Sequence, residues 1–297
     1  MAGGQERALR QRIRSVRSTR KITKAMELIA ASQIPRSLAR IMANRPYRLG
    51  MQRIILEAAL GDPAGARKLL RLPEKVDTAL VLVITGDRGL SGAYNNASLR
   101  AGERLVVKLK SEGTAVQLFV VGKKGGAFFR FRGIEVQESF SGFVDRPTYA
   151  DAQEIARRLS APFISGDAQQ VLLVSTRYFS AGSQAIEIEQ LLPLVIPELP
   201  ESTEPQPLHG YTEFEPDVEK LLFFLMPRAI ESEIFAALLE GAASFHTSQQ
   251  RAMAAATDNA DELGQTLTRV MNRARQDSIT TEIMEIVGGA EALRSGK

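Results

Sequence analysis

Apolar residues recur at steps of three and four from residue 5 to about residue 60. This spacing places them on one narrow stripe and predicts a long amphipathic helix with a coiled-coil seam. Pro35 removes a backbone hydrogen bond at a cost of about 3 kcal/mol inside a helix, so we expect a kink or break there. Asn44-Arg45-Pro46 is a second weak point. The predicted seam contains Leu9, Ile13, Val16, Thr19, Ile22, Met26 and Ile29.

A second helical pattern follows Pro227, after which the sequence contains no further proline. It predicts another very long helix, and a helix with a narrow apolar stripe needs a partner to cover that stripe. We therefore expect the two terminal helices to form a long antiparallel coiled coil, with Ile283 in its seam. Under that interpretation, Ile283→Asp destabilises the pair. The apolar positions of the second helix include Ile230, Ile234, Leu238, Leu263, Leu267, Val270, Ile283 and Ile286.

The middle of the chain alternates β-branched runs with helical patterns, which predicts an α/β fold with a largely parallel, Rossmann-like sheet. The predicted strands span residues 78–85, 116–121 and 170–175, the predicted helices 96–110 and 149–160, and residues 184–193 are expected to add an edge strand. Residues 197–207 are rich in Pro, Glu, Ser and Thr and predict an exposed linker. The expected domains are an N-terminal helix (1–60), an inserted α/β domain (75–207) and a C-terminal helix (208–297).

Composition excludes several kinds of chemistry. The chain has no cysteine, which rules out disulfides, thiol nucleophiles and thiolate metal sites, and its two histidines, His209 and His246, lie far apart in sequence. We therefore predict no catalytic residue, no cofactor and no metal. The sequence has neither a run of about 18 apolar residues nor an apolar signal core, so we expect a soluble, non-secreted protein. An organellar transit peptide is the alternative for the Arg-rich start.

Positive charge gathers at the beginning of the chain. From Arg7 to Arg53 cations recur every few residues, and Glu6 and Glu27 are the only nearby acids. This distribution predicts an acidic partner, and the adjoining seam favours a protein. The alternatives are a basic coiled-coil protein that binds nucleic acid phosphates, or a helix face that is simply solvated. No base-reading motif or aromatic platform supports nucleic-acid binding.

Two glycine-rich turns follow predicted strands. Gly122-Lys123-Lys124-Gly125 lacks the spacing of a phosphate loop, and Ser91, within Gly86-Asp87-Arg88-Gly89-Leu90-Ser91-Gly92, has no histidine in a nucleophile motif. We predict tight strand-to-helix connections in both places. An independent enzyme in the middle domain is the third alternative.

A family resemblance extends over essentially the whole chain. Thr19-Arg20-Lys21-Ile22-Thr23-Lys24-Ala25-Met26-Glu27-Leu28 closely resembles the N-terminal helix of ATP synthase gamma subunits. The most specific match is Ile279-Thr280-Thr281-Glu282-Ile283-Met284-Glu285-Ile286-Val287-Gly288-Gly289-Ala290-Glu291-Ala292, which resembles the family's C-terminal signature. Further matches, in the family's order, are Arg45-Pro46-Tyr47, Asp87-Arg88-Gly89-Leu90, Gln190-Leu191-Leu192-Pro193, Glu215-Pro216-Asp217 and Ala255-Ala256-Thr257-Asp258-Asn259-Ala260.

The resemblance implies a non-catalytic rotor. It places the two terminal helices inside the hexamer of alpha and beta subunits, and the α/β domain at a foot that joins the epsilon subunit and the c-ring. Proton flow turns the ring and this shaft, and ATP is made on the beta subunits. The implied location is the cytoplasmic face of the bacterial plasma membrane, with peripheral attachment through the complex.

The same resemblance assigns contact residues. Acidic loops of the beta subunits are expected to meet Arg275, Gln276 and Thr280, with Lys21, Lys24 and Met26 on the facing part of the first helix. Phe214 and Glu215 are expected at the foot, against the polar loops of the c-ring. Charge reversal at Lys21 or Arg275 should change coupling more than folding.

Some positions depart from the family's pattern. Gln249 and Gln250 stand where an Arg-Met pair is usual, which puts one cationic contact to the beta subunits in doubt. Gln33 and Pro35 replace basic or helix-favouring residues, and Ser91 stands where cysteine is frequent. The chain has no cysteine-bearing insert, which argues against the redox-switched chloroplast type.

Overall fold

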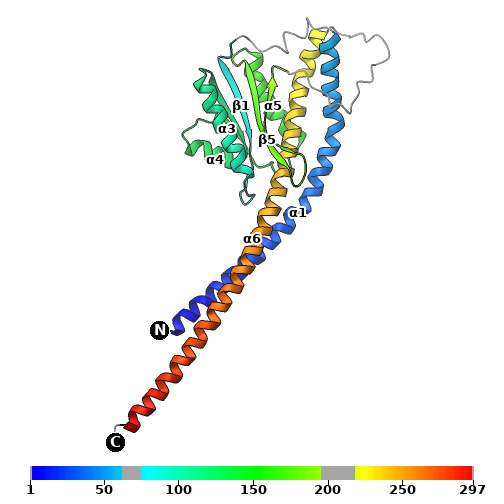
Figure 1. Ribbon diagram of the computed structural model, residues 1–297. Helices are drawn as coiled ribbons and strands as arrows, with labels where there is room; N and C mark the ends of the chain where they lie inside the picture. The colour runs from blue at the N-terminus through cyan, green and yellow to red at the C-terminus, as the bar shows by residue number, and fades with distance from the viewer. Residues whose placement is uncertain (1, 62–74, 195–217, 296–297) are drawn as a thin grey trace. The chain divides into compact units, whose positions relative to one another are not determined.

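The computed structural model of the chain describes residues 2–61, 75–194 and 218–295 (Figure 1). The chain divides into two compact units. The helical-pair unit comprises Met1–Ala30 and Gln249–Lys297, and the sheet unit comprises Ala31–Ser248. The elements, in chain order, are α1 (Ala2–Gly61), β1 (Thr78–Ile84), α3 (Tyr94–Ser111), β2 (Ala115–Val121), α4 (Lys123–Phe131), β3 (Glu138–Phe140), α5 (Tyr149–Ile164), β4 (Gln170–Tyr178), β5 (Gln184–Leu192) and α6 (Val218–Ser295).

One five-stranded sheet organises the sheet unit, in the order β3-β2-β1-β4-β5. The first four strands of this order pair in parallel, and β5 runs antiparallel to β4 at the edge. The chain moves outward from β1 through β2 to β3 and then crosses to the other side of β1, which is the arrangement of a Rossmann-like half. The predicted fold class, a Rossmann-like α/β domain inserted between two long helices, is confirmed.

Both faces of the sheet are covered, which explains why its central strands are continuous apolar runs. Alternate residues of β1 enter two separate cores. Leu80, Leu82 and Ile84 pack with α1, α5 and α6, whereas Ala79, Val81 and Val83 pack with α3 and α4. Figure 1 shows α3 and α4 together beside β1. The six predicted strands and helices of this domain appear within four residues of their expected ends.

Helix α5 shows how local sequence fixes an element. Thr148 lies at its N-cap, where its hydroxyl accepts a hydrogen bond from the Asp151 backbone N–H at 3.3 Å. The Asp151 carboxylate accepts one from the Thr148 backbone N–H at 2.6 Å. This reciprocal capping box satisfies two amides that the first turn leaves without partners.

We expected a kink or a break at Pro35, and a break is wrong, because α1 continues through both Pro35 and Pro46. Each proline is exposed, so water can bond the carbonyl that its missing N–H releases. Helix α6 likewise begins at Val218 and contains Pro227. The predicted boundaries near residues 60–75 and 207 fall at stretches outside the described residues, and the predicted linker lies there too.

Candidate functional site

The seam of the helical-pair unit follows a heptad-like spacing on both helices. On α1 the buried or half-buried positions include Leu9, Ile13 and Val16, and on α6 they include Met253 and Leu267. The spacing predicted for α1 fails at three later positions, whereas Met26 is half-buried as expected. Ile22 is 58% exposed and Ile29 is 62% exposed, and Thr19 is exposed as well.

Polar contacts replace apolar ones in the middle of this seam. The buried hydroxyls of Thr23 and Thr257 lie 2.8 Å apart, and Arg20 forms an ion pair with Asp261. Arg20 and Asp261 remain about half exposed, so their pairing adds little stability. The buried contact between Thr23 and Thr257 instead favours one register of the two antiparallel helices.

The predicted contact residues on α1 lie beside this polar stretch. Lys21 and Lys24 are exposed, and Met26 is half-buried. The Lys24 ammonium lies 3.0 Å from the Glu27 carboxylate, one turn along the same helix. Since the pair is local and the Lys24 side chain is half exposed, Lys24 can turn from Glu27 to a carboxylate on a partner.

The second predicted group, Arg275, Gln276 and Thr280, is exposed on α6. The Thr280 hydroxyl donates to the Gln276 carbonyl at 3.0 Å, within the helix. Thr257 lies opposite Thr23, next to Lys21 and Lys24, so it marks the level of the first group on α6. Arg275 lies 18 residues beyond Thr257, or about 27 Å along the helix at 1.5 Å per residue. The structure therefore does not bring the two groups together, and the expectation that they face each other is wrong. Phe214 and Glu215 lie outside the described residues.

Helix α6 ends in a stretch that is exposed on every side. Its large apolar residues include Ile279, Ile286 and Ile283, the last of which is 54% exposed. The prediction that Ile283 lies in the seam is wrong, because the buried and half-buried positions of α6 end at Ser278 and residues 279–291 are all exposed. Exposed apolar side chains on a single helix mark a surface that a partner covers.

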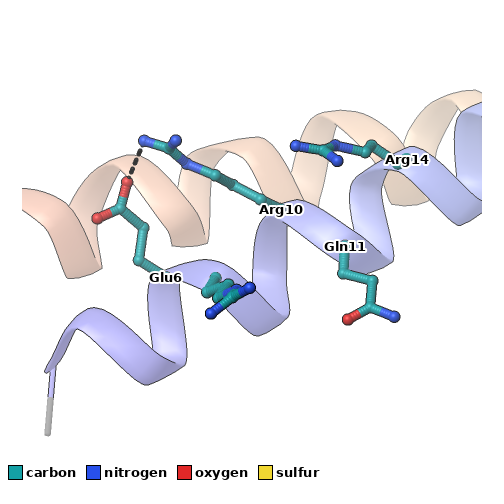
Figure 2. Close-up of a pocket in the computed structure, with 5 residues that line it drawn as sticks. Glu6, Arg10, Gln11 and Arg14 are labelled. Carbon is teal, nitrogen blue, oxygen red and sulfur yellow. Dashed lines mark hydrogen bonds and ion pairs between the residues drawn. The ribbon is translucent and has the colours of Figure 1, made fainter.

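The beginning of α1 presents a cationic face. Glu6, Arg7, Arg10, Gln11 and Arg14 line an open hollow of about 560 Å³ on this one helix. Figure 2 shows Glu6 and Arg10 pointing toward one another, while Gln11 points away. The Arg10 Nη2 and Glu6 Oε1 atoms of this ion pair lie 2.5 Å apart. One helix cannot enclose a small molecule, so this face suits an acidic macromolecular surface.

The glycine-rich turn at α4 has no free amides for a phosphate. The backbone N–H of Lys123 donates to the Asp87 carboxylate at 3.0 Å, and that of Gly125 donates to the Thr85 hydroxyl at 3.1 Å. A Cβ at Gly122 would lie 2.4 Å from the Thr85 carbonyl oxygen, so glycine is needed for close packing. The Asp87 carboxylate thus occupies the place where an anion would bind at this helix end.

The turn after β1 is held rigidly and displays one apolar side chain. Asp87 also accepts from the Gly142 N–H at 2.7 Å, and Asn95 accepts from Gly86 and donates to the Arg88 carbonyl. Within this frame Leu90 adopts a positive φ of 61° and is 63% exposed. The sequence analysis included Leu90 in a family-matching segment, but its positive φ and its exposure could not be read from the local pattern.

The polar groups near this turn are unsuited to catalysis. Ser91 is buried and its hydroxyl accepts from Asn95, an amide that cannot serve as a base. Burial lowers the pKa of His246, which is 4% exposed, and burial raises the pKa of Tyr94. All three groups are closed to a substrate and neutral at pH 7. Among the described residues no acidic or histidine cluster could hold a metal ion, and none of their helices is long and apolar enough to cross a membrane.

Comparison with known proteins gives a consistent result. The family model described as ATP synthase matches residues 5–293. The ATP synthase gamma chain of Frankia casuarinae is 48% identical over 297 residues, which cover 99% of each chain. That of Kineococcus radiotolerans is 44% identical over 299 residues, which cover 98% of each chain.

Solved structures share the fold at lower identity. A chain of the Euglena gracilis mitochondrial ATP synthase (OSCP/F1/c-ring, rotational state 3) has a TM-score of 0.66 and 18% identity, covering 99% of this chain and 96% of that one. A chain of the Tetrahymena thermophila mitochondrial ATP synthase (central stalk/c-ring) has a TM-score of 0.61 and 23% identity, covering 79% and 99%. At these identities the likeness establishes the arrangement of the chain and not the role of single residues.

Proposed function

The chain belongs to the ATP synthase gamma chain family, and from this membership we propose that it is the central-stalk rotor of an F-type ATP synthase. One structural observation carries the proposal furthest. The functional surface is an exposed helical rod with an uncovered apolar end, and not a pocket that could bind a substrate. The rotor has no catalytic role of its own.

The partners follow from the family. The helical pair enters the hexamer of alpha and beta subunits, and the sheet unit meets the epsilon subunit and the c-ring. The apolar end of α6 supports the first contact, because a surrounding sleeve of protein would remove Ile279 and Ile286 from water. Proton flow through the ring turns the shaft, and ATP forms on the beta subunits.

Coupling then depends on differential contact. A rotor shifts a catalytic subunit between conformations only if its contact free energy differs between them. Lys21, Lys24, Arg275 and Gln276 are exposed polar groups that can form charge-assisted hydrogen bonds with acidic loops and release them again. Their separation along the rod supports two levels of contact, with Met26 beside the first level and Thr280 beside the second. Phe214 and Glu215 stay proposals for the contact with the c-ring.

We place the complex on the cytoplasmic face of a bacterial plasma membrane, attached peripherally. Support comes from the bacterial relatives named above, and the membrane sector itself belongs to other subunits. The alternative of nucleic-acid binding is not supported, since relatives matching the full length are gamma chains.

Reconstitution tests the proposal. The purified chain is mixed with the alpha and beta subunits of the same organism, and complex formation and ATP hydrolysis are measured. We expect a stable complex that hydrolyses ATP, and a chain that neither assembles nor stimulates hydrolysis would refute the rotor function. Duplex DNA and RNA at varied salt serve as the comparison, because binding only to these would revive the alternative.

Charge reversal tests the contact residues in the assembled enzyme. Lys21→Glu and Arg275→Glu should each reduce ATP-driven proton pumping while leaving the thermal stability of the free chain unchanged. Arg269→Glu is the matched control, since Arg269 is exposed on α6 and has no assigned contact. Unchanged pumping in both test variants would remove these residues from the interface. Gln249, which the structure buries, is not a free surface residue where an arginine contact could be restored simply.

A further inference from the structure

A cluster of charged side chains joins four elements of the sheet unit, namely α1, α6, β4 and β5. None of the sequence patterns or proposed partner contacts includes it. The cluster contains two arginines, four glutamates and one glutamine: Arg48, Arg177, Glu187, Glu189, Glu233, Glu240 and Gln52.

Arg48 connects α1 to α6. Its Nε donates to Glu233 Oε2 at 2.7 Å, and its Nη1 lies 3.6 Å from Glu240 Oε1. Gln52, one turn further along α1, donates to Glu233 Oε1 at 2.9 Å. The Arg48 side chain is only 15% exposed, so water screens these contacts less than it screens a surface ion pair.

Arg177 connects the two strands to the same helix. Its Nη1 lies 3.2 Å from Glu189 Oε1 and 3.7 Å from Glu187 Oε2, both on β5, and its Nε lies 3.4 Å from Glu240 Oε2. Glu240 Oε2 also accepts a hydrogen bond from the Tyr178 N–H of β4 at 3.0 Å. Glu240 therefore contacts both arginines and the backbone of the sheet.

The cluster holds four carboxylates against two guanidinium groups. Burial raises the pKa of Glu240 and of Glu189, against the opposing effect of the two arginines. Burial opposes the charge on Arg48 as well, but the nearby carboxylates outweigh it and raise the pKa of Arg48. Removing either arginine would leave several partly buried carboxylates close together without compensation, which is strongly unfavourable.

We propose that this charged cluster is the joint that passes torsional load between the sheet and the helices α1 and α6, with Glu240 as its central positioning residue. The inference rests on the proposed rotor function. Apolar packing between helix and sheet is non-directional and resists sliding poorly, whereas charge-assisted hydrogen bonds depend on direction. Glu233 and Glu240 lie about two turns apart on α6, so bonds at both points oppose rotation about the helix axis and movement along it.

The experiment uses the assembled, membrane-bound enzyme carrying Glu240→Gln or Arg48→Gln. Glu240→Gln should assemble and hydrolyse ATP normally but pump severalfold fewer protons per ATP hydrolysed. Arg48→Gln should lose pumping to a similar degree and should also lower the thermal stability of the chain, because it leaves carboxylates uncompensated. Arg157→Gln is the matched control in the sheet unit, because its ion pair with Glu154 is exposed and lies within α5. The control should pump as the wild type does.

Exchanging the charges of Arg48 and Glu233 distinguishes a contact that transmits load from one that only stabilises the fold. Arg48→Glu and Glu233→Arg should each uncouple the enzyme, and the double variant should regain most of the pumping even if one single variant folds poorly. Wild-type pumping in Glu240→Gln and Arg48→Gln would overturn the proposal, as would a double variant no better than the worse single one. If the wild-type chain itself fails to assemble, the rotor function falls and the joint falls with it.

Discussion

Helix α6 passes through both units, and its burial differs sharply between them. In the sheet unit every residue from 236 to 247 is buried, whereas in the helical-pair unit a buried or half-buried position recurs mainly at heptad spacing as far as Ser278. Small side chains such as Ala237, Gly241 and Ala243 let the sheet and its helices approach α6 closely. The surroundings of a helix, more than its own periodicity, therefore decide how much of it is buried.

Truncation of a buried leucine should show the largest difference. Leu82 on β1 is fully buried, and Leu82→Ala should cost about 3–5 kcal/mol of unfolding free energy because the packed sheet cannot collapse around the cavity. Leu267→Ala, in the helical pair, should cost about 2 kcal/mol, since two helices can move together. Chemical denaturation followed by circular dichroism measures both. Equal losses of unfolding free energy in the two variants would show that the helical pair is packed as tightly as the sheet unit.

Adding one methyl group should act with opposite sign in the two units. A Cβ at Gly102 would lie 2.7 Å from Val83 Cγ2, so Gly102→Ala should destabilise the sheet unit by about 1–3 kcal/mol. A Cβ at Gly264 would lie 3.9 Å from Val16 Cγ1, an ordinary packing distance, so Gly264→Ala should stabilise α6 by up to about 1 kcal/mol. Thermal unfolding of each variant gives the sign directly, and destabilisation by Gly264→Ala would mean that the helices are packed more tightly than described.

The polar centre of the helical pair should give a smaller, non-additive effect. Thr257→Val leaves the buried Thr23 hydroxyl without its cross-helix partner and should cost about 1 kcal/mol. The double variant Thr23→Val, Thr257→Val should recover most of that loss, because both polar groups are then removed. A double-mutant cycle on unfolding free energies measures the coupling, and strictly additive costs would show that the contact contributes nothing.

The smallest effect is expected at the exposed end of α6. Ile283→Asp should change the unfolding free energy of the free chain by less than about 0.5 kcal/mol, because the side chain has little to lose. Binding to the alpha and beta subunits should weaken in the same variant, while Glu282→Gln, one residue away and also exposed, should bind normally. A marked loss of stability in Ile283→Asp would show that this residue packs in the seam.

The sheet could be predicted from the sequence, while the seam could be predicted only in part. Strands such as β1 are buried on both faces, so their apolar runs stand out within a short window. The seam of α1 instead passes through Thr23, whose partner lies 234 residues away in sequence. A local pattern favours the apolar Ile22 and Ile29, because it contains no information about what lies across the pair.

The predictions for Pro35 and for the end of α6 failed for a related reason. The cost of Pro35 depends on whether its carbonyl partner reaches water, and exposure is a property of the folded chain. Ile283 has seam-like spacing but no helix beside it. Among the candidate contacts, the exposure of Lys21 and Arg275 agrees with a partner-binding role. The distance between these two residues could not be predicted, because it depends on the register of the two helices.

The exposed end of α6 also affects the chain before it meets its partners. An isolated helix of about a dozen residues is marginally stable in water, so the order of this end depends on the protein that surrounds it. A copy synthesised without partners offers proteases a loose apolar segment. We therefore expect proteases to cleave the unassembled chain in this segment before the rest of the molecule.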